Sequence, residues 1–312
     1  MHDMTKLCGV CPILPTPFDE NGAVDEESLV RVVGFLIDAG VHGIALFGNA
    51  SEGFALTGAE KQQIAETVVE TNAGRVPLIF GAGGTGIEPM KDSVRWAEKN
   101  GAEMLMMMPP YMIKPDAERI YEFYAEAART TELPIMLQDA PGACGVAIPV
   151  ETVKRLNDTF DNITHIKAEA PPTFLKARKI LDATDGRMTV FGGMNGVTFY
   201  EELLSGVTGT MPAGEFPEVL CRVYDAFVAG ERDAAREEFC RYLPFMRLGT
   251  TPGGMGMAVH KEILRRGGIF ETATVRNPYV PATEHLMELV WETLRDRPLL
   301  ALEYGKNRES RG

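Results

Sequence analysis

Short apolar runs alternate with longer amphipathic segments along most of this chain. The runs contain four to six residues each and carry few polar interruptions. Runs of this kind are typical of parallel strands that are buried on both faces. We expect eight such strands, at Val10–Leu14, Gly43–Phe47, Pro77–Phe80, Glu103–Met108, Pro134–Leu137, Ile163–Lys167, Met188–Phe191 and Thr208–Met211.

In the longer segments, apolar positions recur three and four residues apart, which is typical of helices that bury one face. Asp25, Thr57 and Asp116 stand where helix N-caps are expected, and Gly40 and Gly101 follow two of the predicted helix ends. We expect eight helices, at Asp25–Ala39, Thr57–Asn72, Ile87–Asn100, Asp116–Thr131, Pro149–Asn157, Thr173–Ala183, Val197–Leu204 and Pro217–Ala229.

Eight successive strand–helix units predict an α/β protein with the fold of a (β/α)8 barrel, also called a TIM barrel. After about Gly230 the strands stop, and three helical patterns follow, at Asp233–Phe245, Met255–Arg266 and Thr283–Arg295. We therefore expect a catalytic barrel over residues 1–229 and a C-terminal helical extension over residues 230–312. Active sites of such barrels lie at the carboxyl ends of the strands, so the residues that follow each strand are the candidates for chemistry.

The composition disfavours several classes of protein. The chain has 31 Lys and Arg against 44 Asp and Glu, and its net charge of −13 would repel nucleic acids and anionic membranes. No apolar stretch reaches the ~18 residues that a membrane helix needs, and residues 1–6 lack the apolar core of a signal peptide. Five cysteines, an odd number, indicate reduced thiols. We expect a cytoplasmic protein that binds neither nucleic acid nor membrane.

A glycine-rich motif and the histidines bear on whether the protein binds a dinucleotide cofactor or a metal. The segment Gly81–Gly86 has the G-x-G-x-x-G spacing of a dinucleotide site. Such a site also requires an acidic residue at the end of the next strand, whereas Glu103 lies at the start of that strand. We therefore expect no nicotinamide or flavin. No H-E-x-x-H motif or cluster of ligands predicts a metal. The histidines that stand alone in the sequence are His2, His42, His260 and His285.

The sixth strand carries the most informative residues. Strand alternation places His165, Lys167 and Glu169 on one face, near the carboxyl end. If that face points into the barrel, desolvation favours the neutral lysine amine, the form that attacks a carbonyl to make a Schiff base. The alternative is a lysine that only pairs with Glu169 or another carboxylate, and its position alone does not decide between the two.

Polar residues also follow other strands. Asn49, Ala50 and Ser51 lie in a glycine-bounded turn after the second strand, which could offer N–H groups and a hydroxyl to a substrate carboxylate. An ordinary loop before a helix would account for this turn equally well. Further candidates for substrate contact at strand ends are Gln138, Asp139, Gly193 and Asn195.

From about Gly9 to the C-terminal helices, the chain resembles the dihydrodipicolinate synthase and N-acetylneuraminate lyase family. The resemblance rests on Pro15–Phe18, the Gly48–Glu52 turn, Met108–Tyr111 and Ile166–Lys167. It implies a (β/α)8 barrel with a C-terminal helical extension and a homo-oligomer, either tetramer or dimer. It also implies that Lys167 forms a covalent imine with a small-molecule 2-oxo acid, without any other cofactor.

The chain departs from most of this family at three places. Gln138–Pro141 reads Gln-Asp-Ala-Pro where Tyr-Asn-x-Pro is usual, so the proton-relaying tyrosine is missing. Ala143 stands where the synthases have an arginine, and Met112, beside Tyr111, stands where a partner subunit's tyrosine is expected. These departures disfavour lysine-biosynthetic synthase activity and sialic acid cleavage.

The same departures are similar to one branch of the family, the 2-keto-3-deoxy-L-arabonate dehydratases. The resemblance implies a hydro-lyase that releases 2-oxoglutarate semialdehyde, with Tyr111 and Met211 among the substrate contacts. Glu169 is the candidate base for the C3 proton, because it lies two residues from Lys167 on the same face. The segments shared with this branch are Asn49–Glu52, Met108–Tyr111, Gln138–Pro141, Lys167–Glu169 and Gly209–Gly214.

Other functions remain open at this point. A class I aldolase would use the same imine to split a 2-keto-3-deoxy or 4-hydroxy-2-oxo acid and release pyruvate. A deaminase of a hydroxyproline-derived imine would share the lysine and carboxylate machinery. A degenerate barrel that only binds a ligand is the non-enzymatic alternative.

Overall fold

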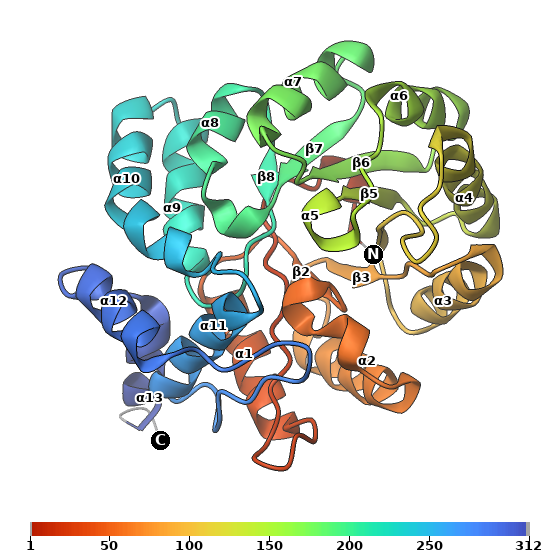
Figure 1. Cartoon of the computed structure of the whole chain (residues 1–312). Coiled ribbons are helices and arrows are strands. Elements are labelled where there is room, and N and C mark those ends of the chain that lie inside the picture. The colour runs from red at the N-terminus through yellow and green to blue at the C-terminus, as the bar shows by residue number, and fades with distance from the viewer. Residues whose placement is uncertain (1, 310–312) are drawn as a thin grey trace. The chain divides into compact units, whose positions relative to one another are not determined.

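The computed structural model describes residues 2–309, in which eight strands alternate with helices and further helices follow (Figure 1). This order confirms the fold class predicted from the sequence, a (β/α)8 barrel with C-terminal helices. The strands are β1 (Gly9–Val10), β2 (Ile44–Leu46), β3 (Leu78–Gly81), β4 (Met104–Met107), β5 (Ile135–Asp139), β6 (Ile163–Ala168), β7 (Thr189–Gly192) and β8 (Gly209–Thr210).

The helices also follow the predicted pattern, and α7 and α11 have the predicted bounds. Those up to β8 are α1 (Glu26–Asp38), α2 (Gly58–Asn72), α3 (Ile87–Lys99), α4 (Ala117–Thr130), α5 (Pro141–Cys144), α6 (Val150–Thr159), α7 (Thr173–Ala183) and α8 (Phe199–Leu204). Those after β8 are α9 (Pro217–Val228), α10 (Arg232–Leu248), α11 (Met255–Arg266), α12 (Glu284–Leu294) and α13 (Leu300–Glu309).

The three predicted N-caps are confirmed. The side chain of Asp25 accepts the backbone N–H of Ser28 at 3.1 Å, and Asp116 caps α4 in the same way. Thr57 and Glu60 form a capping box at the start of α2. Each cap satisfies N–H groups that the first helical turn cannot pair by itself.

The first strand was predicted too long, because the structure ends it at Val10. The segment beyond is buried and makes ladder-like bonds at Ile13 and Leu14, but Pro12 has no N–H to donate. A proline inside a buried ladder removes a bond that a regular strand needs. The short helix α5 and the last helix, α13, were not predicted.

The chain divides into two compact units, and the first comprises residues up to Gly9, Pro77–Met194 and Thr198–Met211. In this unit β3 to β8 are parallel neighbours in chain order. Figure 1 shows α3, α4, α6 and α7 along the outer side of these strands. The β4 residues Met104–Met107 are all buried, as expected for methionines that fill a core.

The second unit comprises Val10–Val76, Asn195–Val197 and the chain from Pro212 onward. It contains β2, α1 and α2, together with α9 to α13, of which α9 packs on α10 and α11 packs on α13. The α11–α13 contact is close because Gly305 donates its N–H to the carbonyl of Gly267 at 2.9 Å. The expected domain boundary at residues 229 and 230 stays a prediction. Among residues 2–309, no helix combines the length and apolar character needed to cross a membrane.

Candidate active site

Strand β6 positions the predicted catalytic lysine. Lys167 lies next to Gln138 of β5 and Phe191 of β7 in the strand register, and its side chain is buried. One strand pleat earlier on the same face, His165 is fully buried, and burial lowers its pKa to about 4. A neutral imidazole therefore lies below Lys167, and the lysine occupies the carboxyl end of the strand, as predicted.

Glu169 follows β6 directly and lies beside the lysine. Its Oε1 is 3.2 Å from Lys167 Nζ, and only 11 % of its side chain is exposed. Gln138 Nε2 donates to Glu169 Oε2 at 3.1 Å, and the N–H of Met194 donates to Oε1 at 3.2 Å. The carboxylate is thus oriented by three groups, each from a different strand end.

Gly193 is the residue that makes room for this carboxylate. A Cβ at position 193 would stand 2.6 Å from both Cγ and Cδ of Glu169, closer than real Cβ atoms come to a neighbour. The preceding residue, Gly192, ends β7 and would meet Glu202 in the same way, with its Cβ 2.8 Å from Glu202 Cδ. Glycine at both positions lets a carboxyl group approach the backbone closely.

Asp139, predicted to contact substrate, has other partners. It is fully buried, its Oδ1 accepts the N–H of Ile148 at 2.8 Å, and its Oδ2 pairs with Lys176. Burial raises the pKa of Asp139, while the bond to Lys176 opposes that shift. These contacts tie β5 to the segments that follow it, so they favour a positioning role, and contact with substrate stays a prediction.

Two other predicted substrate residues of this unit differ in exposure. Tyr111 is 39 % exposed in the loop that follows β4. Met211 is buried after β8, and its N–H donates to the carbonyl of Gly192 at 3.2 Å. Glu202 and Lys176 were missed by the sequence analysis, since each lies on a helix far along the chain from its partner.

In the second unit, the predicted carboxylate-binding turn is a short 3-10 helix, Asn49–Ser51. Asn49 and Ala50 are half-buried, whereas Ser51 is buried, and its Oγ has no hydrogen-bond partner among residues 2–309. The hydroxyl of Thr16 donates to the carbonyl of Ser51 at 2.7 Å, which fixes the backbone. A fixed turn with an unused buried hydroxyl is suited to bind a ligand oxygen.

A buried ion pair lies directly behind this turn. Glu52, which is fully buried and in the left-handed conformation, pairs with the equally buried Lys261 of α11. The N–H of Arg276 donates to Glu52 Oε2 at 2.7 Å, and Lys261 Nζ also lies 4.2 Å from the centre of the Phe18 ring. Burial lowers the pKa of Lys261 to about 8, despite the opposing effect of Glu52. Neither Lys261 nor Arg276 was predicted from the sequence.

Asn195 also lies in the second unit, in the left-handed conformation. Its Oδ1 accepts the N–H of Ala213 at 3.2 Å, so part of its amide orders the chain after β8. Beside it, His260 Nδ1 lies 2.5 Å from Oε1 of the fully buried Glu215. The spacing of Glu215 and His260 along the chain does not indicate this pair, because the packing of α11 against the segment after β8 brings the two together.

His2 Nδ1 lies 3.0 Å from the carboxylate of Glu103, a contact that the sequence spacing does not indicate. The N–H of Leu78 also donates to Glu103 Oε1 at 3.4 Å, so both contacts hold Glu103 just before β4. Gly84 supports a structural interpretation of the Gly81–Gly86 motif, because a Cβ there would meet the Met90 N–H at 2.7 Å. Among residues 2–309, no group of three or more His, Cys, Asp or Glu is placed to hold a metal ion.

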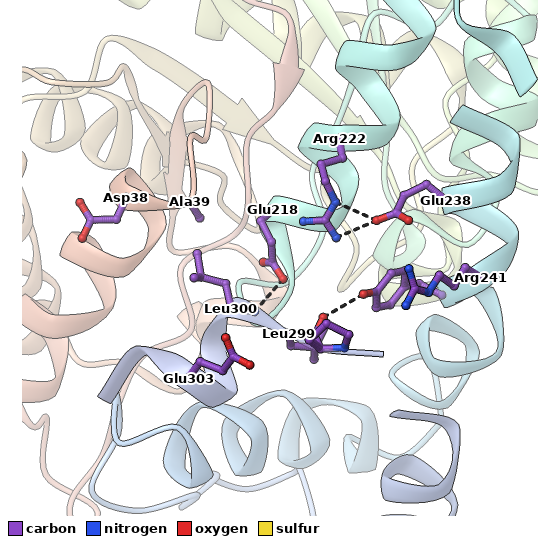
Figure 2. Close-up of a pocket in the computed structure, with 11 residues that line it drawn as sticks. Asp38, Ala39, Glu218, Arg222, Glu238, Arg241, Leu299, Leu300 and Glu303 are labelled. Carbon is purple, nitrogen blue, oxygen red and sulfur yellow. Dashed lines mark hydrogen bonds and ion pairs between the residues drawn. The ribbon is translucent and has the colours of Figure 1, made fainter. Parts of the chain in front are cut away.

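A separate hollow of about 520 Å³ opens on the second unit (Figure 2). Glu218 of α9 and Tyr242 of α10 line it, together with Leu300 at the start of α13. Arg222 and Glu238 pair with each other on its wall, at 2.7 Å. None of the predicted site residues lines this hollow, so it is not the candidate active site.

Comparison with protein families gives one match across most of the chain. The model described as "Dihydrodipicolinate synthetase family" matches residues 6–296. An L-2-keto-3-deoxyarabonate dehydratase of Azospirillum brasilense is 32% identical over 86% of this chain and 88% of that protein. A 4-hydroxy-tetrahydrodipicolinate synthase of Parabacteroides distasonis is 30% identical over 93% of this chain and 97% of that protein.

Solved structures show the same fold. A monomeric dihydrodipicolinate synthase variant superposes with a TM-score of 0.88 at 28% identity, covering 96% of this chain and 100% of that one. The dihydrodipicolinate synthase of Thermotoga maritima gives a TM-score of 0.86 at 28% identity, over 93% and 98% of the two chains.

Proposed function

Because this chain belongs to the dihydrodipicolinate synthetase family of Schiff-base lyases, we propose that it dehydrates a 2-keto-3-deoxy sugar acid. The preferred substrate is 2-keto-3-deoxy-L-arabonate, and the product is 2-oxoglutarate semialdehyde. The observation that carries the proposal is the buried Lys167 with Glu169 Oε1 3.2 Å from its Nζ. The similarity to the Azospirillum brasilense dehydratase supports the choice of substrate.

In the first step, the Lys167 amine adds to the C2 ketone, and loss of water gives an imine. Attack requires the nitrogen lone pair, so the ammonium must first give up a proton, which water takes up, and Glu169 stays ionised for the next step. Lys167 is buried and only 11 % of the Glu169 side chain is exposed, which limits the access of water to the imine.

The second step removes a proton from C3. A protonated imine at C2 acidifies C3, and the resulting electron pair is delocalised as an enamine. Glu169 is the base in this proposal, because its carboxylate is oriented by Gln138 and by the Met194 N–H. Gln138 itself stands at the strand end where most of the family has a tyrosine.

The enamine then expels the C4 hydroxyl, which takes up a proton and leaves as water. Loss of a proton from C5 gives an enol at C4 and C5. Protonation of C3 and C4, with loss of the enol O–H proton, converts C5 into an aldehyde, and hydrolysis of the imine frees Lys167. One water is consumed in hydrolysis and one is released on imine formation, so the net change is loss of the C4 hydroxyl as water. Asn49, Ala50 and Ser51 are proposed to hold the substrate carboxylate, and Tyr111, Asn195 and Met211 the rest of the molecule.

The first test is the intact mass of the protein after borohydride treatment with pyruvate or, separately, with 2-keto-3-deoxy-L-arabonate. We expect an adduct with both compounds in the native chain and none in Lys167→Ala. Without borohydride, 2-oxoglutarate semialdehyde indicates the dehydratase, and pyruvate with an aldehyde indicates the aldolase. Absence of any adduct in the native chain would remove the Schiff-base proposal and favour a ligand-binding barrel.

A homo-oligomer in the cytoplasm stays a prediction.

A further inference from the structure

Two carboxyl groups approach the end of β7 from opposite sides. Gly192 and Gly193 are consecutive, so hydrogens in the side-chain positions of the two residues point to opposite faces of the strand end. A Cβ at Gly192 would meet the carboxyl of Glu202, and a Cβ at Gly193 would meet the carboxyl of Glu169. One stretch of glycine backbone therefore lies between Glu202 and Glu169.

Glu202 is fixed more firmly than an ordinary helix residue. It lies on α8 and is buried, and its Oε1 accepts hydrogen bonds from Thr173 at 2.6 Å and Thr198 at 2.8 Å. Its Oε2 has no hydrogen-bond partner among the residues that the structure describes. Burial, together with the charges of Glu169 and Glu201, raises the pKa of Glu202 to about 7.

A buried carboxyl with a free oxygen and a raised pKa destabilises a fold, and the proposed reaction has no step for it. Two successive contacts nevertheless connect the Glu202 carboxyl to Glu169. The carboxyl packs against Gly192, and the next two residues, Gly193 and Met194, contact the Glu169 carboxylate from one side. A shift of this backbone moves the surface and the N–H group that orient Glu169.

We propose that Glu202 is a positioning residue for Glu169, acting through the Gly192–Gly193 backbone. The inference rests on the proposed function, because it assumes that Glu169 takes the C3 proton. Without the Glu202 carboxyl, Gly192 relaxes toward α8, Gly193 and the Met194 N–H withdraw, and Glu169 loses its fixed place. Lys167 stands on β6 and keeps its place, so imine formation survives while proton removal slows.

The test separates these two steps with pyruvate as the probe. Borohydride trapping measures the imine, and loss of the pyruvate methyl signal in D2O measures proton removal at C3. In Glu202→Ala we expect the adduct to form as in the native chain, and methyl exchange to fall at least about tenfold, since misplacing a catalytic group by ~1 Å can cost ~10²-fold. Glu202→Gln keeps the shape of the protonated acid, and we expect exchange within about threefold of the native rate.

Glu201→Gln is the matched control. Glu201 is the neighbour of Glu202 on α8 and is exposed, so this variant makes the same Glu-to-Gln change on the same helix without touching Gly192. We expect native adduct formation and native exchange from it.

A reciprocal pair of variants excludes a merely structural role. Gly192→Ala alone places a methyl group against the Glu202 carboxyl and should slow exchange about as much as Glu202→Ala does. In the double variant Gly192→Ala/Glu202→Ala the methyl group occupies the space that the carboxyl left, and exchange should recover to within about threefold of the native rate. Such non-additivity is expected only of groups that share one contact.

The outcomes are distinct. Native exchange in a folded Glu202→Ala, or an equal loss of adduct and exchange, would overturn the positioning role while leaving the proposed function intact. Strictly additive losses in the double variant would overturn it as well. A native chain that forms no adduct with pyruvate or 2-keto-3-deoxy-L-arabonate would remove the proposed function, and this inference with it.

Discussion

The side chain of Glu169 illustrates what close packing does for a base. A free glutamate has three rotatable side-chain bonds, and fixing them costs entropy that must be recovered from contacts. Here Lys167, Gln138 and the Met194 N–H contribute those contacts, and Gly193 sets the distance of the backbone. The ordering is complete before substrate arrives, so the reaction does not bear its cost.

Gly193→Ala tests whether that distance matters. The added methyl group would lie 2.6 Å from Cγ and Cδ of Glu169, so the side chain has to leave its bonds to Gln138 and Met194. We expect pyruvate to form the borohydride-trapped adduct as before, while methyl exchange in D2O falls about 10- to 100-fold.

Gly142→Ala is the control for this prediction. It makes the same change at an exposed glycine where a Cβ meets no atom within 4 Å. Equal exchange rates in the two variants would show that Glu169 does not need its present place.

At the residue scale, alternation along one strand was enough to predict that Lys167 and Glu169 share a face. It could not predict Asp139 with Lys176, or Glu215 with His260, because these partners come from separate elements. The sequence gives their spacing along the chain only, whereas the pairing depends on how helices pack. Glu202 was missed for the same reason, since nothing in its helix indicates that Gly192 faces it.

At the element scale, local chemistry predicted most helices and strands. Side-chain caps such as Thr57 act within a few residues of themselves, so their effect is readable from sequence. The prediction of one strand over Val10–Leu14 was too long, because hydrophobic periodicity counts Pro12 as apolar and takes no account of its missing N–H. Helix α13 lacks a marked apolar face, and it is stabilised by tertiary contacts such as that of Gly305 with Gly267.

One of these tertiary contacts predicts a pH dependence of stability. Glu218 of α9 accepts the N–H of Leu300, at the start of α13, with a distance of 2.9 Å (Figure 2). Burial raises its pKa to about 7, from about 4.5 in the unfolded chain. Between these pH values the folded protein keeps a proton that the unfolded chain has lost, so the stability contributed here falls as pH rises from about 4.5 to 7.

We expect Glu218→Gln to remove this loss. A neutral amide can still accept the Leu300 N–H, so the variant and the native chain should unfold at similar urea concentrations at pH 5. At pH 8 the variant should be more stable by about 1 to 3 kcal/mol, since each pKa unit corresponds to ~1.4 kcal/mol.

The exposed Glu237 of α10 offers the control, and Glu237→Gln should show no such difference. A gain in the stability of Glu218→Gln that is the same at pH 5 and pH 8 would contradict the titration of Glu218.

At the scale of the whole molecule, chemistry and stability are linked. Any ligand that binds only the folded chain raises its free energy of unfolding, by about 1.4 kcal/mol at ten times Kd. A compound that forms an imine with Lys167 is such a ligand. It differs from a compound that binds through its carboxylate alone, because imine formation requires a ketone. Thermal unfolding therefore reports the proposed chemistry without knowledge of the natural substrate.

We expect pyruvate at ten times its Kd to raise the Tm of the native chain by about 3 °C, because ~1 kcal/mol corresponds to ~2–4 °C in a chain of this size. Lactate has the same carboxylate but a hydroxyl in place of the ketone, so its effect should be smaller, and in Lys167→Ala the two compounds should act alike. After borohydride and dialysis, only the native chain treated with pyruvate should keep its raised Tm, since only there does a covalent bond remain. If Lys167→Ala gained as much from pyruvate as the native chain does, the stabilisation would come from the carboxylate, and the imine would have no part in it.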